Sequence, residues 1–152
     1  MLTHTLKTLT LGAVLAATPA VTLADPVRVA SQVPVAEAVT RLADAVEAAG
    51  ARVFSVVNFA EGAASVGQEL RPTTLVIFGS PKIGAAALQD GQTMAMELPL
   101  KILIYEDAAG DVWLMHDDPL ETAPMHGLTA DNPAVQNMRA ALDRMAAVAS
   151  GH

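Results

Sequence analysis

Residues 67–84 indicate the fold of this chain most clearly. Their sequence is Gly67-Gln68-Glu69-Leu70-Arg71-Pro72-Thr73-Thr74-Leu75-Val76-Ile77-Phe78-Gly79-Ser80-Pro81-Lys82-Ile83-Gly84. A polar approach leads into the continuous apolar run Leu75 to Phe78, which is typical of a central strand covered on both faces. The Gly- and Pro-rich exit, residues 79–84, predicts a tight turn that opens a helix. The stretch therefore predicts a buried strand followed directly by a helix.

Apolar residues recur at spacings of three and four on both sides of this stretch, as they do along one face of a helix. The first set predicts a helix with Pro34 in its first turn and Gly50 as its C-terminal cap. The second set follows Asn132 or Asp131 as the cap and Pro133 as the start. The two sets are Val35, Val39, Leu42, Val46 and Ala49, and Val135, Met138, Leu142, Met145 and Ala149.

Four further segments have the composition of strands, being alternating or rich in β-branched and aromatic residues. They are residues 26–33, 52–59, 102–105 and 112–115, the last two joined by a hairpin loop. Glu61 to Ala64 suits a turn that leads into a short helix ending at about Leu70. We expect an α+β fold: a single compact two-layer domain, with a mixed or mostly antiparallel sheet of four to five strands packed against two main helices.

Residues 1–24 are set apart as a secretory signal peptide. Lys7 gives a positive start, Leu9 to Leu23 are mostly apolar, and Thr22-Leu23-Ala24 has small residues where a signal peptidase reads them. The apolar run of about 15 residues is shorter than the roughly 20 that a membrane-spanning helix needs. The sequence thus predicts a mature domain of residues 25–152, located in the periplasm or secreted, with no membrane insertion after cleavage.

Charge and cysteine content exclude several classes of partner and chemistry. The predicted mature chain has eight Lys and Arg against sixteen Asp and Glu, a formal net charge of −8. Nucleic acids and anionic membranes both require clustered positive charge, so neither is expected as a partner. The chain contains no cysteine, which removes disulfides, thiolate metal sites and thiol catalysis.

Several short segments, in their order and spacing, resemble the bacterial family called domain of unknown function 302. They are residues 66–73, 77–82, 97–101, 113–114, 117–119 and 126–128, within a matching core of about residues 35–128. The resemblance implies a small α+β domain, favours the periplasm over the medium, and supplies no established catalytic residues.

One hypothesis places a ligand site at the two ends of the apolar run, with a histidine expected nearby. Backbone amides at the start of a helix attract anions, and Ser80 and Lys82, beside Gly79, add a hydroxyl and a charge. Glu69 and Arg71 can bracket a ligand carboxylate, and His126 is expected nearby. The structural alternatives are a turn that needs Gly and Pro for geometry alone, and an arginine that pairs with an acid or holds loop carbonyls.

Thioether and imidazole groups suggest a copper site as an alternative, because these ligands hold Cu(I). The residues are Met94, Met96, Met115, His116, Met125 and His126. Met115, however, fits the alternating pattern of a strand, and methionine readily fills gaps in a core. A purely structural role is therefore the alternative. No other cofactor is predicted.

The sequence favours a non-catalytic module that binds a small ligand or a partner protein. A copper-binding protein and an unrecognised enzyme are the alternatives. His116 and Asp117 argue against the enzyme, because they are adjacent on a predicted strand end and would point to opposite faces rather than pair. The high hydrophobic content, 52%, also suggests a homodimer, because an apolar surplus can be buried between copies.

Overall fold

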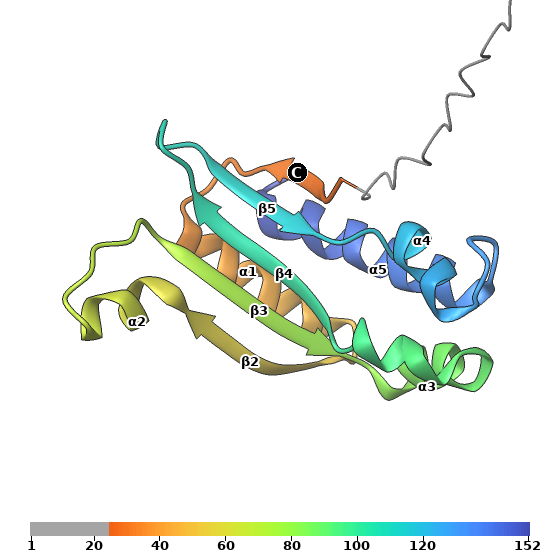
Figure 1. The fold of residues 1–152 in the computed structure, drawn as a ribbon. Helices are drawn as coiled ribbons and strands as arrows, with labels where there is room; N and C mark the ends of the chain where they lie inside the picture. The colour runs from red at the N-terminus through yellow and green to blue at the C-terminus, as the bar shows by residue number, and fades with distance from the viewer. Residues whose placement is uncertain (1–24) are drawn as a thin grey trace, which may run out of the picture.

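The computed structural model describes residues 25–152, so the predicted signal peptide lies outside the described residues. An antiparallel five-stranded sheet runs through the domain in the order β1-β5-β4-β3-β2 (Figure 1). The strands are β1 (Val27–Ala30), β2 (Arg52–Asn58), β3 (Thr73–Gly79), β4 (Leu100–Glu106) and β5 (Val112–His116). The chain is therefore α+β, as predicted, and every strand pair is antiparallel.

Two long helices cover one face of this sheet. They are α1 (Val35–Ala48) and α5 (Pro133–Ser150), and Figure 1 shows both behind the sheet. Leu42 and Val46 of α1 and Val135 and Met138 of α5 are fully buried. The two helices predicted from apolar periodicity are confirmed, and each turns its apolar stripe toward the sheet.

The residues at the ends of these helices explain where each helix begins or stops. Asn132 caps α5 by accepting hydrogen bonds from the amides of Ala134 and Val135. Gly50, just beyond α1, has a φ of 71°, in the left-handed region that favours glycine. Pro34 precedes α1 as its N-cap rather than lying in the first turn.

β3 lies between β2 and β4, and its side chains alternate in burial. Thr74, Val76 and Phe78 are buried toward the helices, whereas Leu75 and Ile77 are partly exposed on the other face. No helix in residues 25–152 covers that second face (Figure 1). The expectation of a strand covered on both faces is therefore wrong for this domain. A continuous apolar run shows that both faces of the strand are apolar, but it does not show whether a helix packs on each face.

Shorter helices surround the sheet at its two ends. They are α2 (Phe59–Ser65), α3 (Pro81–Asp90), η1 (Gln92–Met96), α4 (Pro119–Thr122) and η2 (Ala123–His126). The prediction that the helix after β2 reaches Leu70 is wrong: α2 ends at Ser65, and Gly67 then turns the chain with a φ of 73°. Residues 89–97 form the end of α3 and η1, and α4 and η2 were not predicted.

Among residues 25–152, no helix combines the length and apolar character required to cross a bilayer.

Candidate functional site

The structure places the two predicted halves of the ligand site at opposite ends of β3. Glu69 and Arg71 precede the strand, and Gly79, Ser80 and Lys82 follow it. Seven extended residues span about 20 Å at the usual rise per residue. These two groups therefore do not form one site, and each end is described separately.

At the first end, Arg71 holds the neighbouring hairpin. Its Nε donates a hydrogen bond of 3.2 Å to the carbonyl oxygen of Glu106, which ends β4. No ion pair joins Glu69 to Arg71 among the described residues. The two residues border an open hollow with Gln68 and Leu70. The hydrogen bond from Arg71 to Glu106 fits the structural alternative, in which arginine holds a loop carbonyl.

At the second end, the chain turns from β3 into α3 within two residues. Ser80 is the N-cap and Pro81 the first helical residue, and the amides of Ile83 and Gly84 both donate to the Ser80 carbonyl oxygen. The Ser80 side chain makes no capping hydrogen bond. The predicted strand-to-helix turn is thus confirmed, with the Ser80 hydroxyl free of the cap.

Beside this turn lies an apolar groove of about 500 Å³, which we call the α3 groove. It runs between α3, η1 and the adjoining ends of β2, β3 and β4. Its lining is apolar except for Ser80, and no charged side chain contributes to it. The lining residues are Phe54, Gly79, Ser80, Pro81, Ile83, Gly84, Ala85, Leu88, Ala95, Leu98, Pro99 and Leu100.

Two glycines and a β-bulge shape the α3 groove. The register of β2 shifts between Val53 and Ser55, so Phe54 is the extra residue, and its ring lies beside Gly79. A methyl group added at Gly79 would lie 3.2 Å from Phe54 Cε2, which leaves that ring little room to spare. At Gly84 an added methyl group would lie 3.5 Å from Leu98 Cδ1, an ordinary contact. The missing side chain of Gly84 therefore leaves space that the groove includes.

Of the remaining predicted ligand residues, neither lies in the α3 groove. Lys82 is exposed on α3. His126 ends η2, where its Nε2 lies 3.1 Å from Glu97 Oε1 and its Nδ1 lies 3.3 Å from the hydroxyl of Thr93. His126 thus ties η2 to the segment around η1.

The six proposed copper ligands are not gathered into one cluster. Met94 is fully buried in the core, while Met96 and Met125 are 79% and 73% exposed. Met115 and His116 lie on β5 and face opposite sides of the sheet. The adjacent residues Met115 and His116 therefore do not point toward a common ion.

His116 instead faces a network of charged groups on α5. Its Nδ1 bonds to the Asp117 carbonyl oxygen at 2.8 Å, and its Nε2, 4.0 Å from Asp143 Oδ1, has no hydrogen-bond partner. Arg139 donates hydrogen bonds to both Asp143 and Asp118, and the bond to the Asp118 carboxylate is the main reason that the pKa of Arg139 is raised above its usual value. The side chains of His116 and Asp117 diverge, as the sequence predicted.

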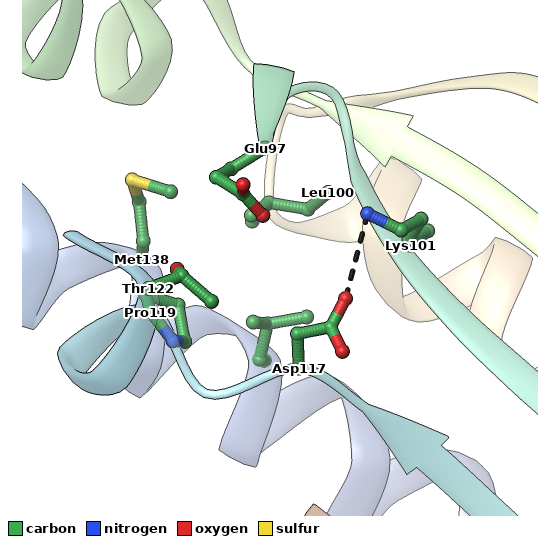
Figure 2. Close-up of a pocket in the computed structure, with 8 residues that line it drawn as sticks. Glu97, Leu100, Lys101, Asp117, Pro119, Thr122 and Met138 are labelled. Atoms are coloured by element: carbon green, nitrogen blue, oxygen red, sulfur yellow. Dashed lines mark ion pairs between the residues drawn. The ribbon is translucent and has the colours of Figure 1, made fainter. Parts of the chain in front are cut away.

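A second, very small cavity lies near this network (Figure 2). It is about 20 Å³, enough for one water molecule. Lys101 Nζ reaches across to Asp117 Oδ2 at 3.6 Å, with Glu97 and Thr122 on the other walls. The space is too small for an organic ligand.

The α3 groove is lined partly by residues of the predicted turn and partly by residues that the sequence did not single out. Gly79, Ser80 and Gly84 belong to the predicted turn, whereas Phe54, Leu88 and Leu98 come from segments that carried no signal of a site.

The profile of one protein family matches residues 27–147, which is most of the chain. The chain belongs to this family, described as "Domain of unknown function DUF302". The resemblance inferred from the short segments is thereby confirmed, and the match extends beyond the core of residues 35–128 at both ends.

A crystal structure agrees with the DUF302 fold. An uncharacterised conserved DUF302 protein from Bacillus stearothermophilus superimposes with a TM-score of 0.66, covering 82% of this chain and 94% of that one. The two sequences are 18% identical. At that identity, the likeness shows the shared fold alone.

Curated relatives with a similar sequence are larger proteins. "Fluoride-specific ion channel FluC 1" of Brucella suis biovar 1 (strain 1330) is 40% identical over 107 residues, which is 69% of this chain and 42% of that protein. "Fluoride-specific ion channel FluC 2" of Brucella melitensis biotype 1 is also 40% identical over 107 residues, 40% of its length. The chain therefore spans about two fifths of the length of these relatives.

Proposed function

We propose that this DUF302 chain is an exported, non-catalytic module that binds a small apolar molecule in the α3 groove. The observation that carries the proposal is the groove itself, whose volume of about 500 Å³ is lined by apolar side chains. Small-molecule sites in proteins are concave, mostly apolar and roughly 300–1,000 Å³ in size. Export rests on the apolar, signal-like composition of residues 1–24.

The lining also limits the chemistry of the ligand. A charged group that entered the α3 groove would lose its hydration and meet no opposite charge, which is costly. The Ser80 hydroxyl can serve one polar group of the ligand, since it is not used by the helix cap. The expected ligand is therefore an uncharged, mainly apolar molecule with at most one hydroxyl or carbonyl group at the Ser80 end.

The same lining supports a binding role over a catalytic one. General acid-base catalysis requires a titratable side chain within hydrogen-bond reach of the substrate. The α3 groove offers none, because its residues are apolar apart from Ser80, and no histidine or carboxylate lines it.

Substitution of Gly84 tests the proposal, since this position can be filled without disturbing the fold. Gly84→Leu places a branched side chain in the space beside Leu98, whereas Gly84→Ala adds a single methyl group at an ordinary contact distance. The probe is N-phenyl-1-naphthylamine, an uncharged dye whose fluorescence rises in apolar surroundings, competed by 1-octanol and 1-decanol. We expect saturable binding by the wild type and Gly84→Ala, and a Kd at least about tenfold higher for Gly84→Leu.

Thermal unfolding of both variants is the control. Gly84→Leu must unfold at or above the wild-type temperature, because leucine is a better helix former than glycine. No saturable binding by the wild type, or equal affinity in Gly84→Leu, would contradict the proposal.

Fluoride handling is a second candidate, favoured by one observation. Two relatives that are 40% identical to this chain are named fluoride-specific ion channels, and more than half of each lies outside the matched region. Because the matched region makes up only about two fifths of each relative, a domain of this kind is expected to act beside the same kind of membrane protein. A strain that lacks this chain should then lose fluoride tolerance and regain it with the wild-type copy, whereas unchanged fluoride tolerance would remove this candidate.

A further inference from the structure

The sheet has a second surface that the α3 groove does not use. We call it the open face: the side chains of the sheet that point away from α1 and α5. Four apolar residues cross it in register on adjacent strands, Val57 opposite Leu75, Leu75 opposite Leu103, and Leu103 opposite Met115. They form a continuous apolar row from β2 to β5.

Nothing in the described part of the chain covers this row. The long helices lie on the other side of the sheet, as Figure 1 shows, and α3 lies beyond the end of β3. Ile77 extends the row along β3, so this interior strand is apolar on both faces. An apolar strand face in the middle of a sheet costs free energy when left in water, and such surfaces mark protein contacts.

The open face also collects the side chains that dominate protein interfaces. The single tryptophan and the single tyrosine of the chain, Trp113 and Tyr105, lie directly opposite each other on β5 and β4. The guanidinium of Arg28 lies 4.5 Å from the Trp113 ring centroid and 5.8 Å from that of Tyr105. Trp, Tyr and Arg are the residues most enriched among those that contribute most to binding.

Hydrogen bonding holds this aromatic corner in place. Trp113 Nε1 donates to Asp107 Oδ2 at 2.9 Å, which fixes the indole against the sheet. A side chain held in one position loses little conformational freedom on binding, so it favours a stable contact.

Charge favours a second copy of the same chain as the occupant. Arg28 makes no ion pair within residues 25–152, while Lys101 is already paired with Asp117. The hairpin next to Trp113 carries Glu106 and Asp111, which also lack ion-pair partners in the described structure. One copy thus offers an unpaired cation on its open face and unpaired acids beside it, which suits a contact between identical acidic chains.

We propose that the open face is the interface of a homodimer. Five strands at the usual spacing, each with about six residues, give a face of about 400 Å² in each copy. The total of about 800 Å² is below the roughly 1,200 Å² at which stable interfaces begin, so the expected contact is weak and transient. The dimer therefore exchanges with monomer at micromolar concentrations instead of being permanent.

The test is sedimentation equilibrium of residues 25–152 at concentrations from about 1 to 200 µM, with Trp113 emission recorded on the same dilution series. The wild type should change from monomer to dimer across this range, and the emission should shift to the blue as Trp113 leaves water. Arg28→Glu should raise the dissociation constant at least about tenfold. The matched control is Arg144→Glu, the same charge reversal at an exposed position on α5, and it should dimerise like the wild type.

A second substitution guards against a local effect of the charge reversal. Met115→Gln makes the β5 end of the apolar row polar without adding charge, and it should also weaken the dimer, provided that its circular dichroism matches the wild type. A wild type that stays monomeric throughout the range would overturn the proposal and leave the open face to a different partner. A dimer that neither Arg28→Glu nor Met115→Gln weakens would overturn it as well, since the contact would then lie elsewhere.

Discussion

Replacing Gly91 with alanine tests how closely the end of α3 packs against η2. Gly91 follows α3 with a φ of −151°, so any residue can adopt its backbone conformation. The obstacle is space: an added methyl group would lie 2.8 Å from the His126 carbonyl oxygen and still closer to the Leu128 side chain. Leu128 is buried, and the carbonyl belongs to the backbone, so neither can simply rotate away.

The expected cost follows from the two contacts. Overpacking a buried position typically costs 1–3 kcal/mol, and the backbone oxygen places Gly91→Ala at about 2 kcal/mol or above. For a domain of this size, about 2 kcal/mol lowers the melting temperature by roughly 8 °C. The assay is urea unfolding followed by circular dichroism, with a thermal scan on the same sample.

Gly62→Ala is the matched control. Gly62 lies within α2, and no atom outside its own helix lies within 4 Å of the position an added methyl group would take. The same substitution should therefore raise stability there by up to about 1 kcal/mol, because alanine is the better helix former. Gly91→Ala within about 0.5 kcal/mol of the wild type would refute the reasoning, since η2 would then move aside without cost.

Three further predictions concern single contacts. Asn132→Ala should lower the free energy of unfolding by about 1–2 kcal/mol in urea titrations, because it removes the cap of α5; no loss would contradict the capping role. The hydrogen bond from Trp113 is the main cause that lowers the pKa of Asp107. The ionised Asp107 carboxylate therefore stabilises the fold at pH values above the pKa that Asp107 has in the unfolded chain, and this stabilisation is lost as pH falls below about 4. Trp113 fluorescence should show this acid transition in the wild type but not in Asp107→Asn. Arg139→Leu should cost about 1 kcal/mol at low salt and less at 0.5 M NaCl, since the side chain is partly exposed; a salt-independent loss would argue for packing instead.

The elements that sequence predicted well are those fixed by neighbours along the chain. The apolar stripes of α1 and α5 follow from the period of the helix, and Asn132 caps its helix through residues two and three positions away. The turn at residues 79–84 was predicted for the same reason, since glycine and proline act on their own backbone. The short helix α4 was missed because its four residues have no periodicity to read.

The sequence singled out only some residues of the α3 groove, because only part of the groove lies in one local segment. Glu69 and Ser80 were placed in one site, although a strand of seven residues between them requires that they lie at opposite ends. Phe54, Leu88 and Leu98 were not chosen, because each is an ordinary apolar residue until the fold brings them together around Gly79 and Gly84.

By itself, the sequence determined the family, the fold class and the positions of the main helices and strands, because these depend on residue type and on spacing of a few positions. Only the tertiary structure decided that Phe54 lies beside Gly79, that the α3 groove is open, and that Trp113 and Tyr105 share an uncovered face. The physical reason is that these surfaces are set by strand register, by one β-bulge, and by which side of the sheet the two long helices occupy. Those features arise from contacts between residues far apart in the chain, where no local pattern records which side chains will meet.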